Sequence, residues 1–103
     1  MIKVSVFYPN KKGGTFDMAY YCDRHIPLVR RLLEPALKGT AVEHGLAGAT
    51  PGSPATYVAM GHLLFETADA FQKAFGPHAA AIMGDIPNYT NTEPVIQISE
   101  VKI

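Results

Sequence analysis

The sequence predicts an α+β fold with one four-stranded antiparallel sheet and two helices, and three observations support this prediction. Segments typical of strands and helices follow one another in the order β-α-β-β-α-β. Glycine and proline residues separate them, and no repeat or linker divides the chain. Right-handed crossovers leave few other ways to cover one sheet with two helices, so this order predicts the ferredoxin-like arrangement, with both helices on one face. With 103 residues, the chain is expected to be a single domain, 1–103.

The first strand and the first helix have clear sequence signals. Residues 2–8 alternate between apolar and other side chains, which is typical of a strand. Asp17 is a good N-cap, because its carboxylate can accept hydrogen bonds from the free amides of a first helical turn. Phe16 and Tyr21 occupy the two positions of a hydrophobic staple around that cap. A helix is therefore expected from about residue 18 to residue 33.

The remaining elements follow from turn residues and apolar runs. Residues 40–47 are expected to form the second strand, and residues 56–65 form the clearest strand in the chain. Thr67 can cap a second helix, which Gly76 and Pro77 interrupt. Because proline is favoured at the first position of a helix, a further helical piece is expected over residues 77–83. The last strand is expected over residues 94–103, starting at its proline.

The third predicted strand is apolar on both faces. One face carries Tyr57, Ala59, Leu63 and Phe65, and the other carries Val58, Met60 and Leu64. Two helices can cover only one face of such a sheet. We therefore expect a second copy of the chain to cover the other face, which gives a homodimer through the sheet faces.

Composition and charge exclude several classes of partner. Nine basic and nine acidic side chains cancel, and no basic stripe with aromatic residues occurs, so we expect no nucleic-acid partner. No apolar run approaches the roughly 20 residues needed to span a bilayer, so we expect no membrane association. The single Cys22 cannot form an internal disulfide, and the N-terminus does not resemble a secretory leader. A cytoplasmic location is therefore expected.

The first helix places a histidine on its apolar face. On a 3.6-residue period, the inward face consists of Met18, Tyr21, Cys22, His25, Leu28, Val29, Leu32 and Leu33. His25 is the only strongly polar member of this set, so its imidazole should point towards the sheet. Pro27 cannot donate a hydrogen bond to the carbonyl of Asp23 and should kink the helix, which would open space beside His25.

An inward histidine has two interpretations. It could be a core residue that hydrogen bonds to a freed carbonyl or to a tyrosine hydroxyl. It could instead line a pocket and act as an acid, a base or a hydrogen-bond donor, because its ordinary pKa of about 6.5 suits proton transfer at neutral pH.

Other candidate sites have weaker signals. His44 and His62 could meet His25 in a three-histidine metal site, but no HxH or HxxxH spacing supports this, and no metal is expected. Cys22 lies one turn before His25 and could be a nucleophile or simply a small buried side chain. The glycine pair at residues 13–14 lacks the spacing of a nucleotide-binding loop, so no cofactor is expected.

Two motifs give the chain a family resemblance. The pattern F-D-x-x-Y-Y-x-x-x-H-x-P-L begins at Phe16, and D-I-P-N-Y-T-N begins at Asp85. Together with the segments IKVSVFYPN, YVAMGHLLF and EPVIQISEVK, they resemble the EthD family, which is named after a protein of ethyl tert-butyl ether degradation. The resemblance covers essentially the whole chain. It implies a dimeric α+β barrel, in which the sheet of each subunit packs against that of its partner.

The resemblance also implies a place for a ligand. Relatives in this superfamily include cofactor-independent monooxygenases and isomerases, and their ligands usually lie in the cleft between helices and sheet. We therefore expect a hydrophobic small molecule there and an oxidoreductase- or isomerase-type reaction of catabolism or secondary metabolism. His25 would be the acid or base, and Tyr21, Leu28, His62 and Tyr89 would bind the ligand. A non-catalytic binding protein and a haem-binding protein remain alternatives.

Overall fold

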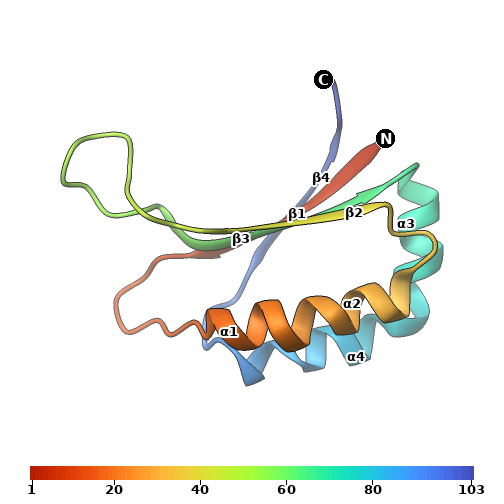
Figure 1. Ribbon diagram of the computed structural model, residues 1–103, viewed down its shortest axis with the longest axis horizontal. Coiled ribbons are helices and arrows are strands. Elements are labelled where there is room, and N and C mark those ends of the chain that lie inside the picture. Colours follow the sequence, from red (N-terminus) through yellow and green to blue (C-terminus); the bar gives the residue numbers. More distant parts are fainter.

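The computed structural model describes residues 1–103 and consists of one four-stranded antiparallel sheet with all helices on one side of it (Figure 1). The strands are β1 (Ile2–Pro9), β2 (Gly39–His44), β3 (Tyr57–Phe65) and β4 (Val95–Glu100). Their order in the sheet is β2-β3-β1-β4, and every neighbouring pair is antiparallel. The predicted ferredoxin-like α+β fold is confirmed.

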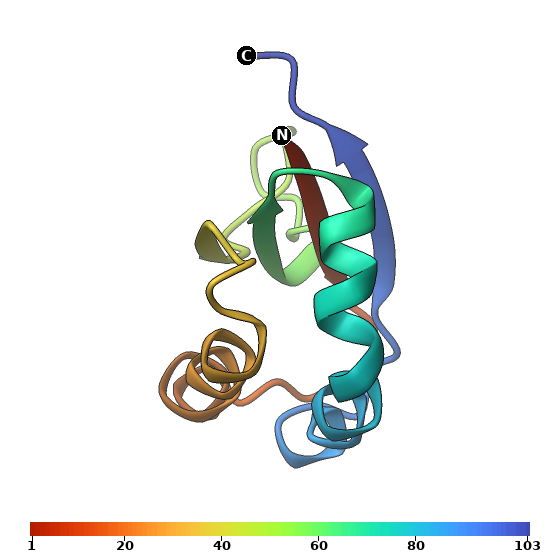
Figure 2. The same cartoon turned by 90° about the vertical axis from the view of Figure 1, so that its right-hand side faces the viewer.

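Two helical segments connect the strands and lie beside each other under the same face of the sheet (Figure 2). The first consists of α1 (Met18–Tyr20), the π-helical turn η1 (Tyr21–His25) and α2 (Ile26–Leu33). The second consists of α3 (Ala68–Phe75), η2 (Gly76–His78) and α4 (Ala79–Gly84), and the short 3₁₀ turn η3 (Ile86–Asn88) follows it. No helix has the length and apolar character that crossing a membrane would require.

The predicted helix caps are confirmed. The carboxylate of Asp17 accepts a hydrogen bond of 3.0 Å from the amide of Tyr20. The hydroxyl of Thr67 accepts one of the same length from the amide of Ala70. The ring of Phe16 lies against that of Tyr21 with a centroid separation of 5.1 Å, so the hydrophobic staple also forms. The caps fix where the two helices start, and the ring of Phe16, which lies 5.0 Å from that of Tyr8 in β1, holds the start of the first helix against the sheet.

Two strands are shorter than the sequence predicts. Strand β2 ends at His44, where Gly45 begins the long loop to β3; a Cβ on this glycine would collide with the backbone of Tyr57. Strand β4 ends at Glu100, and beyond it only the amide of Val101 bonds back to the start of β1.

The main difference from the prediction lies beside Pro27, where a kink was expected. The helix instead widens into a π-turn, in which the amide of Ile26 donates to the carbonyl of Tyr21, five residues earlier. Proline has no amide hydrogen to donate, and the wider turn accommodates it without ending the helix. The helix then continues to Leu33.

The π-turn changes which side chains face the sheet. The buried residues of the segment are Tyr21, His25, Ile26, Val29 and Leu33. A turn closed by an i→i+5 bond holds more residues than an α-helical turn, so the later residues are rotated from the 3.6-residue pattern. Cys22, expected on the inward face, is exposed, and Leu28 is only half-buried.

A β-bulge changes the start of β3 in a similar way. The pairing with β1 shifts between Tyr8 and Pro9, so that Val58 is the extra residue. Val58 packs against the helix side, and the ring of Tyr57 lies 5.0 Å from that of Phe7 on the other face. The predicted grouping of Tyr57 and Val58 was therefore wrong, whereas Ala59 and Phe65 share one face as predicted, and that face is buried under the helices.

The space between helices and sheet holds two clusters of buried side chains. The apolar core consists of Val4, Val29, Leu33, Leu37, Phe65 and Ile82. The aromatic core consists of Tyr8, Tyr21, Ile26, Ala59 and Tyr89. The opposite face of the sheet has no helix on it, and we refer to it as the outer face.

Candidate functional site

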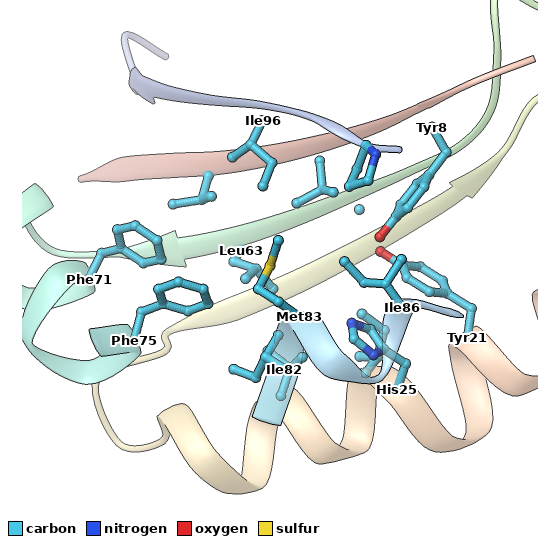
Figure 3. A pocket seen from close by; sticks show the side chains of 16 residues that line it. Tyr8, Tyr21, His25, Leu63, Phe71, Phe75, Ile82, Met83, Ile86 and Ile96 are labelled. Atoms are coloured by element: carbon cyan, nitrogen blue, oxygen red, sulfur yellow. The ribbon is translucent and has the colours of Figure 1, made fainter. Parts of the chain in front are cut away.

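A cavity of about 200 Å³ lies between the two cores (Figure 3). Sixteen residues line it, 13 of them hydrophobic. They are Val4, Val6, Tyr8, Tyr21, His25, Ile26, Val29, Gly61, Leu63, Phe71, Phe75, Ile82, Met83, Ile86, Pro94 and Ile96. The polar groups of Tyr8, Tyr21 and His25 gather at one end, and Phe71 and Phe75 lie at the other (Figure 3). The cavity is therefore apolar with a single polar end.

His25 stands at this polar end and points inward, as the sequence predicts. Only 5% of the residue is exposed. Its Nδ1 lies 2.8 Å from Oδ2 of Asp85, and its Nε2 lies 3.4 Å from the hydroxyl of Tyr89. A carboxylate can only accept hydrogen bonds, so Nδ1 carries the proton that it donates to Asp85. Nε2 is then an acceptor, and the hydroxyl of Tyr89 is its neighbour.

Asp85 is held in place by two further donors. Its Oδ1 accepts a hydrogen bond of 2.7 Å from the hydroxyl of Tyr20 and one of 2.9 Å from the side-chain amide of Asn88. Burial raises the pKa of Asp85, but the hydrogen bonds from Tyr20, Asn88 and His25 outweigh that effect, and the net result is a lowered pKa. The carboxylate is therefore ionised at neutral pH and fixes the orientation of the imidazole.

Burial also controls the protonation of His25. It lowers the pKa of the imidazole below its ordinary value of 6.5, and the hydrogen bond and negative charge of Asp85 only partly offset this effect. At neutral pH the ring is therefore neutral, with its proton on Nδ1. A neutral imidazole can accept a proton at Nε2 from a bound molecule that replaces the long, 3.4 Å contact with the Tyr89 hydroxyl.

Three tyrosine hydroxyls complete the polar end. Those of Tyr8 and Tyr89 are 2.7 Å apart, and the hydroxyl of Tyr21 points to the same end of the cavity as that of Tyr8 (Figure 3). Burial is the main reason that the pKa of each phenol is raised, so all three remain neutral donors at neutral pH. Tyr21 fits against the sheet because residue 61 is glycine; a Cβ at Gly61 would collide with the hydroxyl of Tyr21.

The structure brings together only some of the predicted site residues. His25 and Tyr21 line the cavity, and Tyr89 contributes through its hydroxyl beside His25. Leu28 does not reach the cavity; it lies in a groove on the outside of the helix, because the π-turn rotates it outward. His62 is also outside the cavity, because it alternates along β3 with Gly61 and Leu63, which face inward.

On the outer face, His62 joins a separate polar cluster. Its Nδ1 lies 2.9 Å from the hydroxyl of Ser5, and its Nε2 lies 2.8 Å from the carboxylate of Glu43. His25 and His62 therefore lie on opposite sides of the sheet and cannot share a metal. No group of three or more histidine, cysteine, aspartate or glutamate side chains is placed to hold a metal ion. Cys22 is exposed, and its sulfur contacts that of Met18.

Two residues of the site were not identified from the sequence. Tyr8 is the last inward-facing residue of the alternating pattern in β1, and this position could have indicated a hydroxyl at the end of the cleft. Asp85 was interpreted only as part of a turn. Its signal was its place in the motif D-I-P-N-Y-T-N, which also supplies Asn88 and Tyr89 to the same hydrogen-bonded group.

Comparisons with known proteins agree with this architecture. A family model described as the EthD domain matches residues 15–93. The solved structure of an EthD-like protein from Ralstonia eutropha is 49% identical to this chain, with a TM-score of 0.95, over 99% of this chain and 92% of that chain.

Two more distant structures show the same fold. An ethyl tert-butyl ether degradation family protein from Bacillus halodurans is 20% identical, with a TM-score of 0.75 and coverage of 99% of each chain. A DABB family protein with a ferredoxin-like fold from Mesorhizobium loti is 12% identical, with a TM-score of 0.57, over 99% of this chain and 96% of that chain. The comparison with curated proteins gives no match.

Proposed function

Because this chain belongs to the EthD domain family, we propose that it binds a hydrophobic small molecule in its cavity and exchanges a proton with it through His25. One observation carries this proposal. A neutral, oriented imidazole and neutral tyrosine hydroxyls stand together at one end of a cavity whose other walls are apolar. Pockets of this kind bind a ligand by its apolar body and orient it by a few polar groups.

The lining of the cavity restricts the chemical class of the ligand. No lysine or arginine lines it, and an unpaired charge would be costly to bury there. The ligand should therefore enter uncharged. A volume of about 200 Å³ fits a small molecule, and its polar group would meet the hydroxyls of Tyr8 and Tyr21. A carbonyl or a phenolic oxygen would satisfy these donors.

The reaction class that fits these groups is proton abstraction next to a carbonyl, or from a phenol. Nε2 of His25 would accept the proton, and the electron pair of the broken bond would remain on the ligand as an enolate or phenolate. The tyrosine hydroxyls would stabilise that oxygen, and the Asp85 carboxylate would stabilise the imidazolium. Return of the proton at another carbon is an isomerisation. The same deprotonation could also begin a cofactor-independent oxidoreductase reaction.

The test begins with native mass spectrometry of freshly purified protein, which identifies a retained ligand and thus a substrate class. Turnover is then compared between the native chain and His25→Gln. The variant should keep its affinity for the ligand and lose turnover by about 10²–10⁴-fold, the usual contribution of a general base. Arg31→Ala, an exposed change on the same helical segment, is the matched control and should behave as the native chain does. Full turnover by His25→Gln would refute the acid–base role.

The same experiment separates the two alternatives. Tight binding without any product in the native chain would mean a non-catalytic binding protein. Haem binding through His25 would require Nε2 to bind iron, whereas Nε2 faces the hydroxyl of Tyr89 and Nδ1 faces Asp85. No feature of the cavity specifically favours haem.

We also propose that a second copy of the chain covers the outer face and gives a homodimer in the cytoplasm. The side chains of Phe7, Tyr57, Met60 and Leu64 are half-buried there with no helix over them, and two such faces are self-complementary by symmetry. Analytical ultracentrifugation at micromolar concentration should show a dimer, and Met60→Lys should shift it to monomer. A native chain that sediments as a monomer would contradict this assembly.

A further inference from the structure

The hydrogen bond between His25 and Asp85 crosses the wall between two separate spaces. His25 lines the inner cavity and Asp85 does not. Asp85 lines a groove on the outside of the helix, and His25 does not. The groove is formed by Tyr20, Asp23, Arg24, Pro27, Leu28, Arg31 and Asp85. The 2.8 Å contact from Nδ1 to Oδ2 therefore joins the buried imidazole to a polar, solvent-facing surface.

We propose that Asp85 is a positioning residue that keeps the proton of His25 on Nδ1 and relays protons between the imidazole and solvent in the groove. The relay rests on the proposed function, in which a proton is taken up at Nε2 in the cavity and gives an imidazolium. The proton on Nδ1 then passes to Oδ2 of Asp85, and the resulting carboxylic acid releases it to water. The imidazole is again neutral, now with its proton on Nε2. In the reverse sequence, water protonates Asp85, Asp85 returns the proton to Nδ1, and the Nε2 proton goes back to the ligand.

The contacts of Asp85 make this role testable, because its two oxygens have different partners. Oδ1 accepts hydrogen bonds from Tyr20 and Asn88, and Oδ2 accepts from His25. In Asp85→Asn, the amide oxygen should take the place of Oδ1, because Tyr20 and Asn88 both donate there. The amide nitrogen must then face Nδ1 and donate to it. The proton of His25 would be forced onto Nε2, where it blocks the base.

The surroundings leave Asp85 as the only acceptor for the Nδ1 proton of His25. The charged side chains on the groove side are Asp23, Arg24 and Arg31, whereas no other charged side chain lines the cavity beside His25. Tyr20, Tyr21 and Tyr89 are the other titratable groups in contact with the pair, and their raised pKa values keep them neutral at neutral pH. Asp85 is thus the one group that can accept the Nδ1 proton and release it to water.

The experiment uses the ligand-free chain with ¹⁵N-labelled histidine and reads the protonation of each ring nitrogen by NMR. The native chain should show a proton on Nδ1 and none on Nε2. Asp85→Asn should show the opposite tautomer. Its ring N–H should also exchange with water at least about tenfold more slowly, because exchange would then require local opening of the wall. Asp85→Glu keeps the carboxylate and should keep the native tautomer. If Asp85→Asn does not fold, Asp85→Ala, which removes the acceptor, should lose the preference for a proton on Nδ1, and an unchanged tautomer would overturn the proposal.

Two controls separate a relay from a purely structural contact. Arg31→Ala changes the groove without touching Asp85 and should leave both readouts unchanged. Leu63→Phe narrows the cavity and should also leave the exchange rate unchanged. The proposal is overturned if Asp85→Asn keeps the native tautomer and rate, or if Leu63→Phe slows exchange instead. Because no ligand is used, failure to find a ligand would refute the proposed function and leave this result standing.

Discussion

The apolar core and the aromatic core lie under the same sheet and along the same helix, yet they differ in chemistry. Strand β1 supplies Val4 to one and Tyr8 to the other, and β3 supplies Phe65 and Ala59. The apolar core holds no polar side chain. The aromatic core holds hydroxyls beside the buried His25, and no buried side-chain polar atom in the chain lacks a hydrogen-bond partner. The comparison indicates that one end of the molecule supplies stability and that the other end places reactive groups beside the cavity.

The largest effect on stability is expected in the apolar core. Phe65 is fully buried, so Phe65→Ala should lower the free energy of unfolding by about 3–5 kcal/mol, through lost burial and the cavity that remains. Urea denaturation measures this change. The NMR signals of His25 in the folded variant should stay at their native positions. A loss of less than about 1 kcal/mol would contradict the assignment of stability to this end.

A smaller effect is expected for a hydroxyl of the aromatic core. Tyr89→Phe leaves the hydroxyl of Tyr8 and Nε2 of His25 without their partner, at a cost of about 1–3 kcal/mol. The double variant Tyr8→Phe with Tyr89→Phe removes both phenolic hydroxyls and should lose less than the sum of the two single variants. Urea denaturation measures the three losses of free energy of unfolding. If the loss in the double variant equals the sum of the two single losses, the two hydroxyls are not coupled.

The pH dependence of stability should also distinguish the two ends. The pKa of His25 is lowered in the folded state, so the unfolded chain binds this proton more readily, and stability falls as the pH drops below about 6.5. The lowered pKa of Asp85 adds a loss in the same direction at lower pH. Between pH 7 and 5, the free energy of unfolding of His25→Gln should depend less steeply on pH than that of the native chain. The difference in slope is at most about 1.4 kcal/mol per pH unit, the value for one proton. Identical profiles for both proteins would contradict a neutral, buried imidazole.

The smallest effect is expected at Cys22, which the π-turn places on the outside. Cys22→Ser should change the free energy of unfolding by less than about 0.5 kcal/mol, as is usual for an exposed side chain. A regular helix would have placed this residue against the sheet. A clear loss of stability would therefore argue against the π-turn.

The sequence predicted the order of elements and the helix starts, because both depend on local patterns. Each of these patterns involves residues that are close together in the sequence. They are the alternation in β1, the caps at Asp17 and Thr67, and the turn residues. The inward direction of His25 was also predictable. It lies four residues beyond Tyr21, and residues four apart lie on the same face of a helix.

The remaining features depend on contacts between distant segments or on irregular backbone. The π-turn rotates Leu28 away from the cavity, and the bulge at Val58 changes the faces at the start of β3. Both interrupt the regular periodicity of a helix or a strand, and the preferences of single residues do not show where such an interruption occurs. The pairing of Asp85 with His25 joins residues 60 positions apart. Its geometry depends on how the second helical segment packs beside the first, so only the motif around Asp85 pointed to it.

The cavity is proposed to place an apolar ligand against Nε2 of His25. NMR of ¹⁵N-histidine-labelled protein during titration with 2-naphthol, a neutral and apolar phenol, tests this placement. We expect saturable binding that shifts the Nε2 signal of His25, leaves that of His62 unchanged and is lost when Leu63→Trp fills the cavity. Failure of 2-naphthol to bind, or binding that leaves the Nε2 signal unmoved, would contradict this placement.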